Sequence, residues 1–291
     1  MADSETRIVS LHCGYTTPGG EYVDGYIARP VDGEPRPGVV LLSGMFGLAW
    51  TQREITRIYA RAGFVAISPD YLGGQRPQNR EDALLVKNSL DVNRTVDALV
   101  GAADFLHSLP WVGPNGRIGI MGFCLGGGLV LLAAARTDKF HAGVVYHQSL
   151  FPDSRELQGI TCRLQCHYGT DDHSTPREEV EAFTKALDQY GKDYELHWYE
   201  GQAHSFAQIT PEADVPAAQR AATNLSQDRA FAFLHRELSQ PTERMPTPVA
   251  VPVAAAVAAP APEPVAAPAP EPVAAPEPER APKARVLIEP A

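Results

Sequence analysis

A cysteine flanked by glycines has the pattern of a catalytic nucleophile. The segment reads Gly122-Phe-Cys-Leu-Gly-Gly127, with Cys124 at its centre. A tight turn between a strand and a helix would project the thiol away from the backbone, and the close backbone approach there requires glycine on either side. The start of the following helix favours the thiolate and directs the Leu125 N–H at an oxyanion. A small buried core residue is the alternative interpretation of Cys124.

Two later segments supply the acid and the base that such a thiol requires. Asp171 and Asp172 follow one predicted strand, and His204 follows the next. The chain order of nucleophile, acid and histidine is that of α/β-hydrolases. The alternatives are structural: a hydrogen-bonded loop histidine at 204 and, for one of the two aspartates, an N-cap of the helix that follows Pro176.

Strands that alternate with helices must position these residues. Short apolar runs predict strands at 37–43, 64–71, 117–123, 141–147, 163–168 and 194–199. Apolar residues at helical spacing predict helices at 52–62, 82–109, 125–135, 177–190 and 219–238. This succession predicts an α/β fold: a mostly parallel sheet with helices on both faces and with its chemistry at the carboxyl ends of the strands. Helix 125–135 lacks a polar face, so we expect it to be buried on all sides.

The segments that carry this chemistry together resemble the dienelactone hydrolase family, a cysteine-nucleophile branch of the α/β-hydrolase fold, from about Val39 to Leu238. The matching segments are Gly122-Phe-Cys-Leu-Gly-Gly127, Gly169-Thr-Asp-Asp-His-Ser-Thr-Pro176, His197-Trp-Tyr-Glu-Gly-Gln-Ala-His-Ser-Phe206 and, as weaker support, Ser68-Pro-Asp-Tyr71. The resemblance implies an α/β-hydrolase fold and a carboxymethylenebutenolidase-like enzyme. Such an enzyme hydrolyses small esters or lactones through a thioester, with neither a cofactor nor a metal.

The resemblance also assigns roles to individual residues. The family's acid lies four residues before the proline, so the implied triad is Cys124, Asp172 and His204 rather than one that uses Asp171. The second oxyanion donor, beside the Leu125 N–H, is by position the backbone N–H of Met45. Candidates to line the substrate site are Phe46, His147, Phe206 and Gln208. For His147, a polar strand-end residue without contact to substrate is the alternative.

Two departures from the family pattern concern the thiol and the substrate. Members that hydrolyse dienelactone carry a glutamate implicated in thiol activation, and this chain has Gly44 at that position. Those members also carry an arginine that binds the substrate carboxylate, and this chain has Gln208 there. A neutral amide binds a carboxylate less strongly than a guanidinium does. Arg76 and Arg80 are candidates to bind the carboxylate instead, with solvated surface charge as the alternative. The departures imply another route of thiol activation.

Composition divides the 291 residues into a domain and a tail. Residues 241–291 hold 14 of the 26 prolines and no Gly, Phe, Trp or Tyr, so they cannot supply a packed core. The octapeptide Ala259–Ala266 recurs as Ala267–Ala274, and its alternating prolines favour an extended polyproline II spacer. We therefore predict one dienelactone hydrolase-like domain at 1–240 and a disordered Pro/Ala-rich tail at 241–291.

Charge and cysteine content indicate the cellular location and the class of partner. The formal net charge is −10, which disfavours nucleic acid and anionic membrane as partners and leaves a small ester or lactone as the expected ligand. Neither a signal peptide nor a membrane span is apparent, so the expected location is the cytoplasm and the four cysteines are expected to be free thiols. Cys162 and Cys166 are expected to be structural rather than a metal pair.

Two other functions stay open at this point. One is a non-catalytic hydrolase-fold protein whose tail presents the apolar end Val286-Leu-Ile288 to a partner protein. The other is a redox-active thiol protein, since a thiolate at a helix start also suits peroxide sensing, although no second cysteine lies near Cys124 in the sequence.

Overall fold

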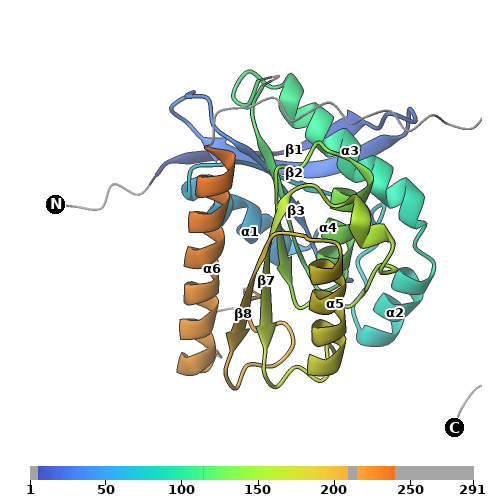
Figure 1. The fold of residues 1–291 in the computed structure, drawn as a ribbon. Coiled ribbons are helices and arrows are strands. Elements are labelled where there is room, and N and C mark those ends of the chain that lie inside the picture. The colour runs from blue at the N-terminus through green and yellow to red at the C-terminus, as the bar shows by residue number, and fades with distance from the viewer. Residues whose placement is uncertain (1–5, 114, 209–214, 240–291) are drawn as a thin grey trace, which may run out of the picture. The chain divides into compact units, whose positions relative to one another are not determined.

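An eight-stranded sheet forms the centre of the computed structural model, which describes residues 6–113, 115–208 and 215–239 (Figure 1). The sheet order is β1-β2-β4-β3-β5-β6-β7-β8. The strands are β1 (Ile8–Thr16), β2 (Tyr22–Pro30), β3 (Gly38–Leu42), β4 (Val65–Pro69), β5 (Ile118–Phe123), β6 (Ala142–Tyr146), β7 (Arg163–Gly169) and β8 (Tyr194–Tyr199). Strands β3 to β8 pair in parallel, whereas β1 and β2 form an antiparallel edge. The predicted mostly parallel α/β sheet is confirmed.

Helices cover both faces of the sheet, as predicted. They are α1 (Trp50–Arg61), α2 (Arg80–Asn88), α3 (Val92–Ser108), α4 (Leu125–Arg136), α5 (Arg177–Gln189) and α6 (Ala217–Leu238), with a short 3-10 helix η1 (Glu156–Gly159). Helices α1 and α6 pack on one face, and α3, α4 and α5 pack on the other (Figure 1). None of the helices in the described part of the chain is long and apolar enough to cross a bilayer.

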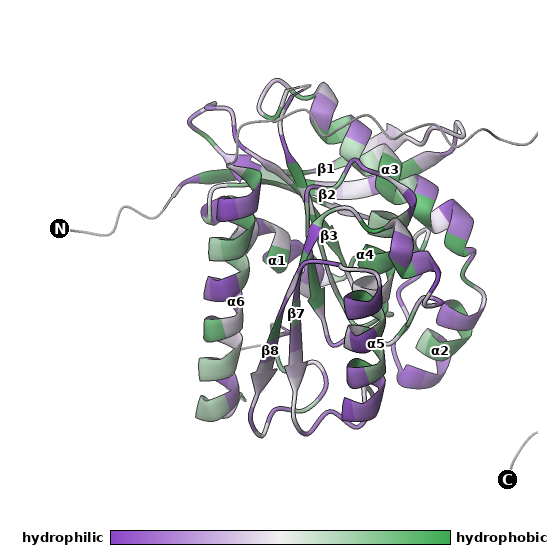
Figure 2. Cartoon of the chain, in the orientation of Figure 1, coloured by the Kyte–Doolittle hydropathy of each residue, from purple (hydrophilic) through white to green (hydrophobic). Residues whose placement is uncertain are grey.

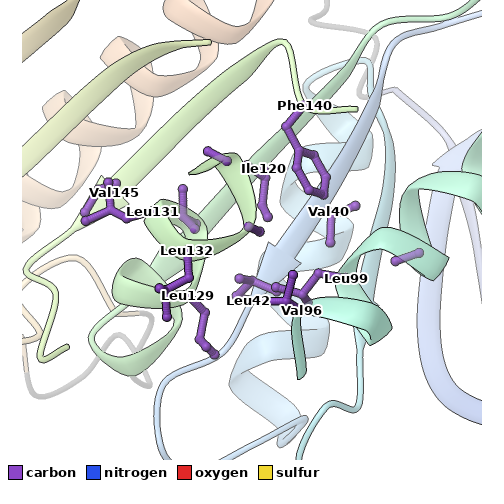
Figure 3. Close-up of a cluster of buried hydrophobic side chains, with 14 of the residues drawn as sticks. Val40, Leu42, Val96, Leu99, Ile120, Leu129, Leu131, Leu132, Phe140 and Val145 are labelled. Atoms are coloured by element: carbon purple, nitrogen blue, oxygen red, sulfur yellow. The ribbon is translucent and has the colours of Figure 1, made fainter. Parts of the chain in front are cut away.

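The core on the α3–α4 side fixes the strands that carry the site. Figure 3 shows Val40 and Leu42 of β3 and Ile120 of β5 in the same cluster of buried side chains as Leu129 and Leu132 of α4. Burial of each such side chain stabilises the fold by about 1.5–3 kcal/mol. Residues 125–134 of α4 are all buried, which confirms the prediction that this helix is covered on all sides. Figure 2 shows the contrast: α4 is mostly hydrophobic, whereas α5 carries both hydrophilic and hydrophobic residues.

Two parts of the fold differ from the predicted elements. The single helix predicted at 82–109 is wrong, because the chain turns at 89–91 and forms α2 and α3. Asp91 caps α3, its side chain accepting a 3.0 Å hydrogen bond from the Arg94 N–H, so a new helix starts although the apolar spacing continues. Strands β1 and β2 fall outside the predicted strands. The predicted tail at 241–291 lies outside the described residues.

Candidate active site

Cys124 occupies the turn between β5 and α4, in a backbone conformation that side chains rarely adopt. Its φ is 54° and ψ is −114°, so the side chain leaves the sheet where the helix begins. A Cβ at Gly122 would overlap the Gly126 carbonyl, and a Cβ at Gly126 would overlap the Ser43 carbonyl. The Cys124 N–H donates a 3.0 Å hydrogen bond to the Tyr146 carbonyl of β6, which ties the turn to the neighbouring strand. The turn therefore has the geometry of a nucleophile elbow.

The surroundings of Cys124 favour its thiolate. Only 3% of the residue is exposed, and burial alone would raise the thiol pKa. Interaction with His204, a hydrogen bond with Ser149 and the Leu125 N–H outweigh that burial, so the pKa of Cys124 is lowered. The Cys124 Sγ and Ser149 Oγ atoms lie 3.3 Å apart. In contrast, burial raises the pKa values of Cys13, Cys162 and Cys166 to about 12.

Asp172 holds His204 beside the thiol. The His204 Nδ1 atom lies 2.8 Å from Asp172 Oδ2. The other carboxylate oxygen, Oδ1, accepts hydrogen bonds from the N–H groups of Ser174 at 2.8 Å and Thr175 at 2.9 Å. Burial opposes the imidazolium, but Asp172 and Cys124 outweigh it and raise the pKa of His204 to about 9. At neutral pH His204 is therefore an imidazolium, and its charge favours the thiolate form of Cys124. Asp171 is exposed and does not contact His204.

A cavity of 360 Å³ opens over Cys124 and His204. Of the four residues expected to line the substrate site, Phe46 and Gln208 line it, as does Met45, the expected oxyanion donor. Phe206 and His147 are buried and do not line this cavity. The ring centroid of His147 is 4.6 Å from that of His204 and 6.0 Å from that of Phe206. The His147 ring therefore packs between those of His204 and Phe206.

His147 is a neutral group in this arrangement. Burial and the neighbouring His204 charge lower its pKa to about 3. Neither of its ring nitrogens has a hydrogen-bond partner among the described residues. Its role is therefore one of packing against His204, which is closer to the structural interpretation of this strand-end residue than to contact with substrate.

The two arginines considered as binders of a substrate carboxylate lie in different surroundings. Arg76 forms an ion pair with the buried Asp70, with Nη1 3.0 Å from Oδ1, and it lines a different cavity. Arg80, the first residue of α2, lines the cavity over Cys124 together with Lys87. No side chain of the described residues forms an ion pair with Arg80. Only Arg80 of the two arginines is placed to meet a ligand there.

Sequence comparison identifies the family. Residues 23–238 match the model of the dienelactone hydrolase family. The chain belongs to this family. Carboxymethylenebutenolidase 1 of Cupriavidus pinatubonensis is 29% identical over 228 residues, which cover 75% of this chain and 94% of that protein. Carboxymethylenebutenolidase of Pseudomonas putida is 27% identical over 211 residues, 69% of this chain and 86% of that protein.

A solved structure supports the fold of this dienelactone hydrolase family member. A dienelactone hydrolase-like promiscuous phosphotriesterase from metagenomic libraries superposes with a TM-score of 0.69 at 22% identity, over 79% of this chain and 98% of that one. The prediction of an α/β-hydrolase fold is confirmed, and so is that of an enzyme of the ester and lactone hydrolase type.

The dienelactone hydrolase fold also brings in residues that the sequence patterns did not indicate. Ser149 and Lys87 both line the cavity, and the Lys87 Nζ donates a 2.8 Å hydrogen bond to the Ser149 carbonyl. Ser149 lies three residues beyond the end of β6, the strand next to the elbow strand, and this position after a predicted strand is the signal that could have pointed to it. Among the described residues, no group of three His, Cys, Asp or Glu side chains is placed to hold a metal ion.

Proposed function

We propose that the protein hydrolyses small esters or lactones with Cys124 as the nucleophile and a thioester as the intermediate. The observation that carries the proposal is the pairing of a thiol of lowered pKa, at the strand-to-helix turn, with a histidine of raised pKa that a carboxylate holds. The ligand is a small molecule that fits the 360 Å³ cavity. No cofactor is needed for this reaction.

In the first half-reaction the Cys124 thiolate attacks the carbonyl carbon and forms a C–S bond. The oxyanion that results accepts hydrogen bonds from the backbone N–H groups of Leu125 and Met45. As the tetrahedral intermediate collapses, the C–O bond to the leaving group breaks and the His204 imidazolium gives its proton to the departing oxygen. The products of this half are a thioester on Cys124 and an alcohol, which stays tethered to the acyl group when the substrate is a lactone.

In the second half-reaction water resolves the thioester. Neutral His204 takes one proton from the water as its oxygen adds to the carbonyl carbon, and the same backbone N–H groups bind the oxyanion. Collapse breaks the C–S bond and releases the carboxylic acid. The Cys124 thiolate and the His204 imidazolium are then restored, so the ion pair of the free enzyme is also the end of the cycle. Asp172 keeps the imidazole oriented throughout.

Arg80 and Lys87 give the cavity a positive charge that favours an anionic substrate. Gln208, which also lines the cavity, adds an amide that can donate a hydrogen bond but has no charge. Arg80 is exposed, so a carboxylate bound to its guanidinium gains about 0.2–1 kcal/mol relative to an unbound one. We therefore propose that the preferred ester or lactone carries a carboxylate and that this group binds to Arg80.

The reaction is tested with Cys124→Ala and His204→Ala on p-nitrophenyl acetate and on a dienelactone. Both variants are expected to lose turnover, because one lacks the nucleophile and the other lacks the proton carrier. Full turnover of Cys124→Ala on both substrates would show the mechanism to be wrong. Circular dichroism of each variant controls for loss of the fold.

The substrate class is tested with matched pairs of esters, one member carrying a free carboxylate and the other its methyl ester. Arg80→Ala is expected to raise KM for the carboxylate substrate by up to about fivefold and to leave KM for the methyl ester nearly unchanged. Arg94→Ala is the matched control, because Arg94 lines a different cavity and pairs with Glu21. Equal effects of Arg80→Ala on both esters would refute the carboxylate contact.

A further inference from the structure

The nucleophile lacks an acidic neighbour at residue 44. A Cβ built on Gly44 would lie 3.6 Å from the Cys124 Cβ, so any side chain at this position would contact the nucleophile. Glycine places no hydrogen-bonding side chain there. His204 is one partner of the sulfur, and a second polar partner comes from another element.

Ser149 provides that group. Its Oγ lies 3.3 Å from the Cys124 Sγ, within the range for a hydrogen bond to sulfur. Two further bonds fix its backbone: the Ser149 N–H donates to the Cys124 carbonyl at 3.0 Å, and the Ser149 carbonyl accepts from the Lys87 Nζ at 2.8 Å. Two residues therefore hold the Ser149 hydroxyl at the sulfur: Cys124, through its backbone carbonyl, and Lys87 of α2.

We propose that Ser149 is a positioning residue that stabilises the Cys124 thiolate in place of an acidic side chain at residue 44. While the sulfur is protonated, its S–H donates to the Ser149 oxygen. After the proton has moved to His204, the hydroxyl rotates and donates its O–H to the sulfur anion. A hydrogen bond to an ion is about twice as strong as one between neutral groups, so the bond favours the thiolate. The inference rests on the proposed function, with Cys124 as nucleophile.

The same bond acts twice in the cycle. In acylation it increases the fraction of enzyme in the reactive thiolate form. In the thioester the sulfur is neutral and accepts hydrogen bonds weakly, so the hydroxyl contributes little there. When the thioester collapses, the sulfur leaves as an anion and the Ser149 O–H binds it again. Loss of the hydroxyl is therefore expected to affect both the pH dependence of acylation and the rate of deacylation.

The test is the pH dependence of Cys124 alkylation by iodoacetamide, followed by mass spectrometry of the intact protein. In Ser149→Ala the midpoint of the alkylation profile is expected to move to higher pH, with about a tenfold smaller thiolate fraction on its acidic side. Ser149→Thr, which keeps a hydroxyl, is expected to restore the wild-type midpoint. Ser154→Ala is the matched control, since Ser154 is exposed and does not line this cavity.

A second pair of variants separates the hydroxyl from the shape of the side chain. Ser149→Thr and Ser149→Val have nearly the same volume, so a difference in alkylation midpoint between them reports the hydroxyl alone and supports the proposal. Equal midpoints in the wild type, Ser149→Ala and Ser149→Val overturn it, whether or not the enzyme hydrolyses esters. Full turnover by Cys124→Ala would instead overturn the proposed function, so the two failures are distinguishable.

Discussion

Asp172→Asn isolates the contribution of one negative charge to the active site. The amide oxygen of asparagine can keep the two bonds that Oδ1 accepts from the Ser174 and Thr175 N–H groups, so the loop is expected to keep its conformation. What changes is the contact at 2.8 Å between Oδ2 and the His204 Nδ1. An amide N–H₂ in that place carries no charge and cannot accept the imidazole proton.

The structure sets the magnitude. The pKa of His204 is raised from 6.5 to about 9. At about 1.36 kcal/mol for each unit, the net preference for the imidazolium is about 3 kcal/mol. Asp172 and Cys124 both contribute to it, against the cost of burial. A carboxylate in contact raises the pKa of a cationic partner by about one to three units, so its removal should shift the His204 titration downward by at least about one.

The assay is the pH profile of kcat/KM for one neutral ester. We expect the wild type to lose activity as the pH rises through about 9, where His204 loses its proton. In Asp172→Asn this alkaline limb should move to lower pH by about one unit or more, and the plateau should fall by about 10²- to 10⁴-fold because the imidazole loses its orientation. Asp171→Asn is the matched control, since Asp171 is exposed and does not contact His204. An unmoved alkaline limb in Asp172→Asn, or the same change in Asp171→Asn, would refute the assignment.

Two further predictions concern the stability of the site. Gly126→Ala should unfold the elbow or abolish activity, because its Cβ would overlap the Ser43 carbonyl, whereas Gly19→Ala, with its nearest atom at 3.7 Å, should leave both the melting temperature and turnover unchanged. Because the His204 pKa is higher in the folded protein than in the unfolded chain, its contribution to stability is complete below about pH 6.5 and is lost as the pH rises through about 9. The lowered pKa of Cys124 has the opposite effect on stability in the wild type, so the decline should appear in urea unfolding of Cys124→Ala and be absent from the double variant Cys124→Ala/His204→Ala.

Local patterns predict the strands that carry the triad because each is a short buried run bounded by turn residues. Strands β5, β7 and β8 end within one residue of their predicted ends, and the polar residues at those ends meet at one edge of the sheet. The break between α2 and α3 escapes such patterns, because the apolar period continues across it while the Asp91 side chain starts a new helix.

Contacts between side chains from distant elements depend on the fold and not on local pattern. Arg76 and Arg80 stand four residues apart and look equivalent in the sequence, yet one is neutralised by Asp70 and the other lines the cavity. The Ser149 hydroxyl meets the Cys124 sulfur only because β6 lies beside β5 and the chain turns back over the elbow. Neither the difference between the two arginines nor the contact of Ser149 with Cys124 can be predicted from residue spacing or composition.

Asp172 shows that a structural and a catalytic interpretation of one residue need not exclude each other. One oxygen accepts two backbone N–H groups at the start of the loop before α5, as a capping residue would, and the other faces His204. Burial opposes ionisation of the carboxyl, but the bond to His204 and the two backbone N–H groups outweigh it and lower its pKa. The capping-type bonds therefore keep the carboxylate charged and oriented, which is the condition under which it holds the His204 imidazolium at neutral pH.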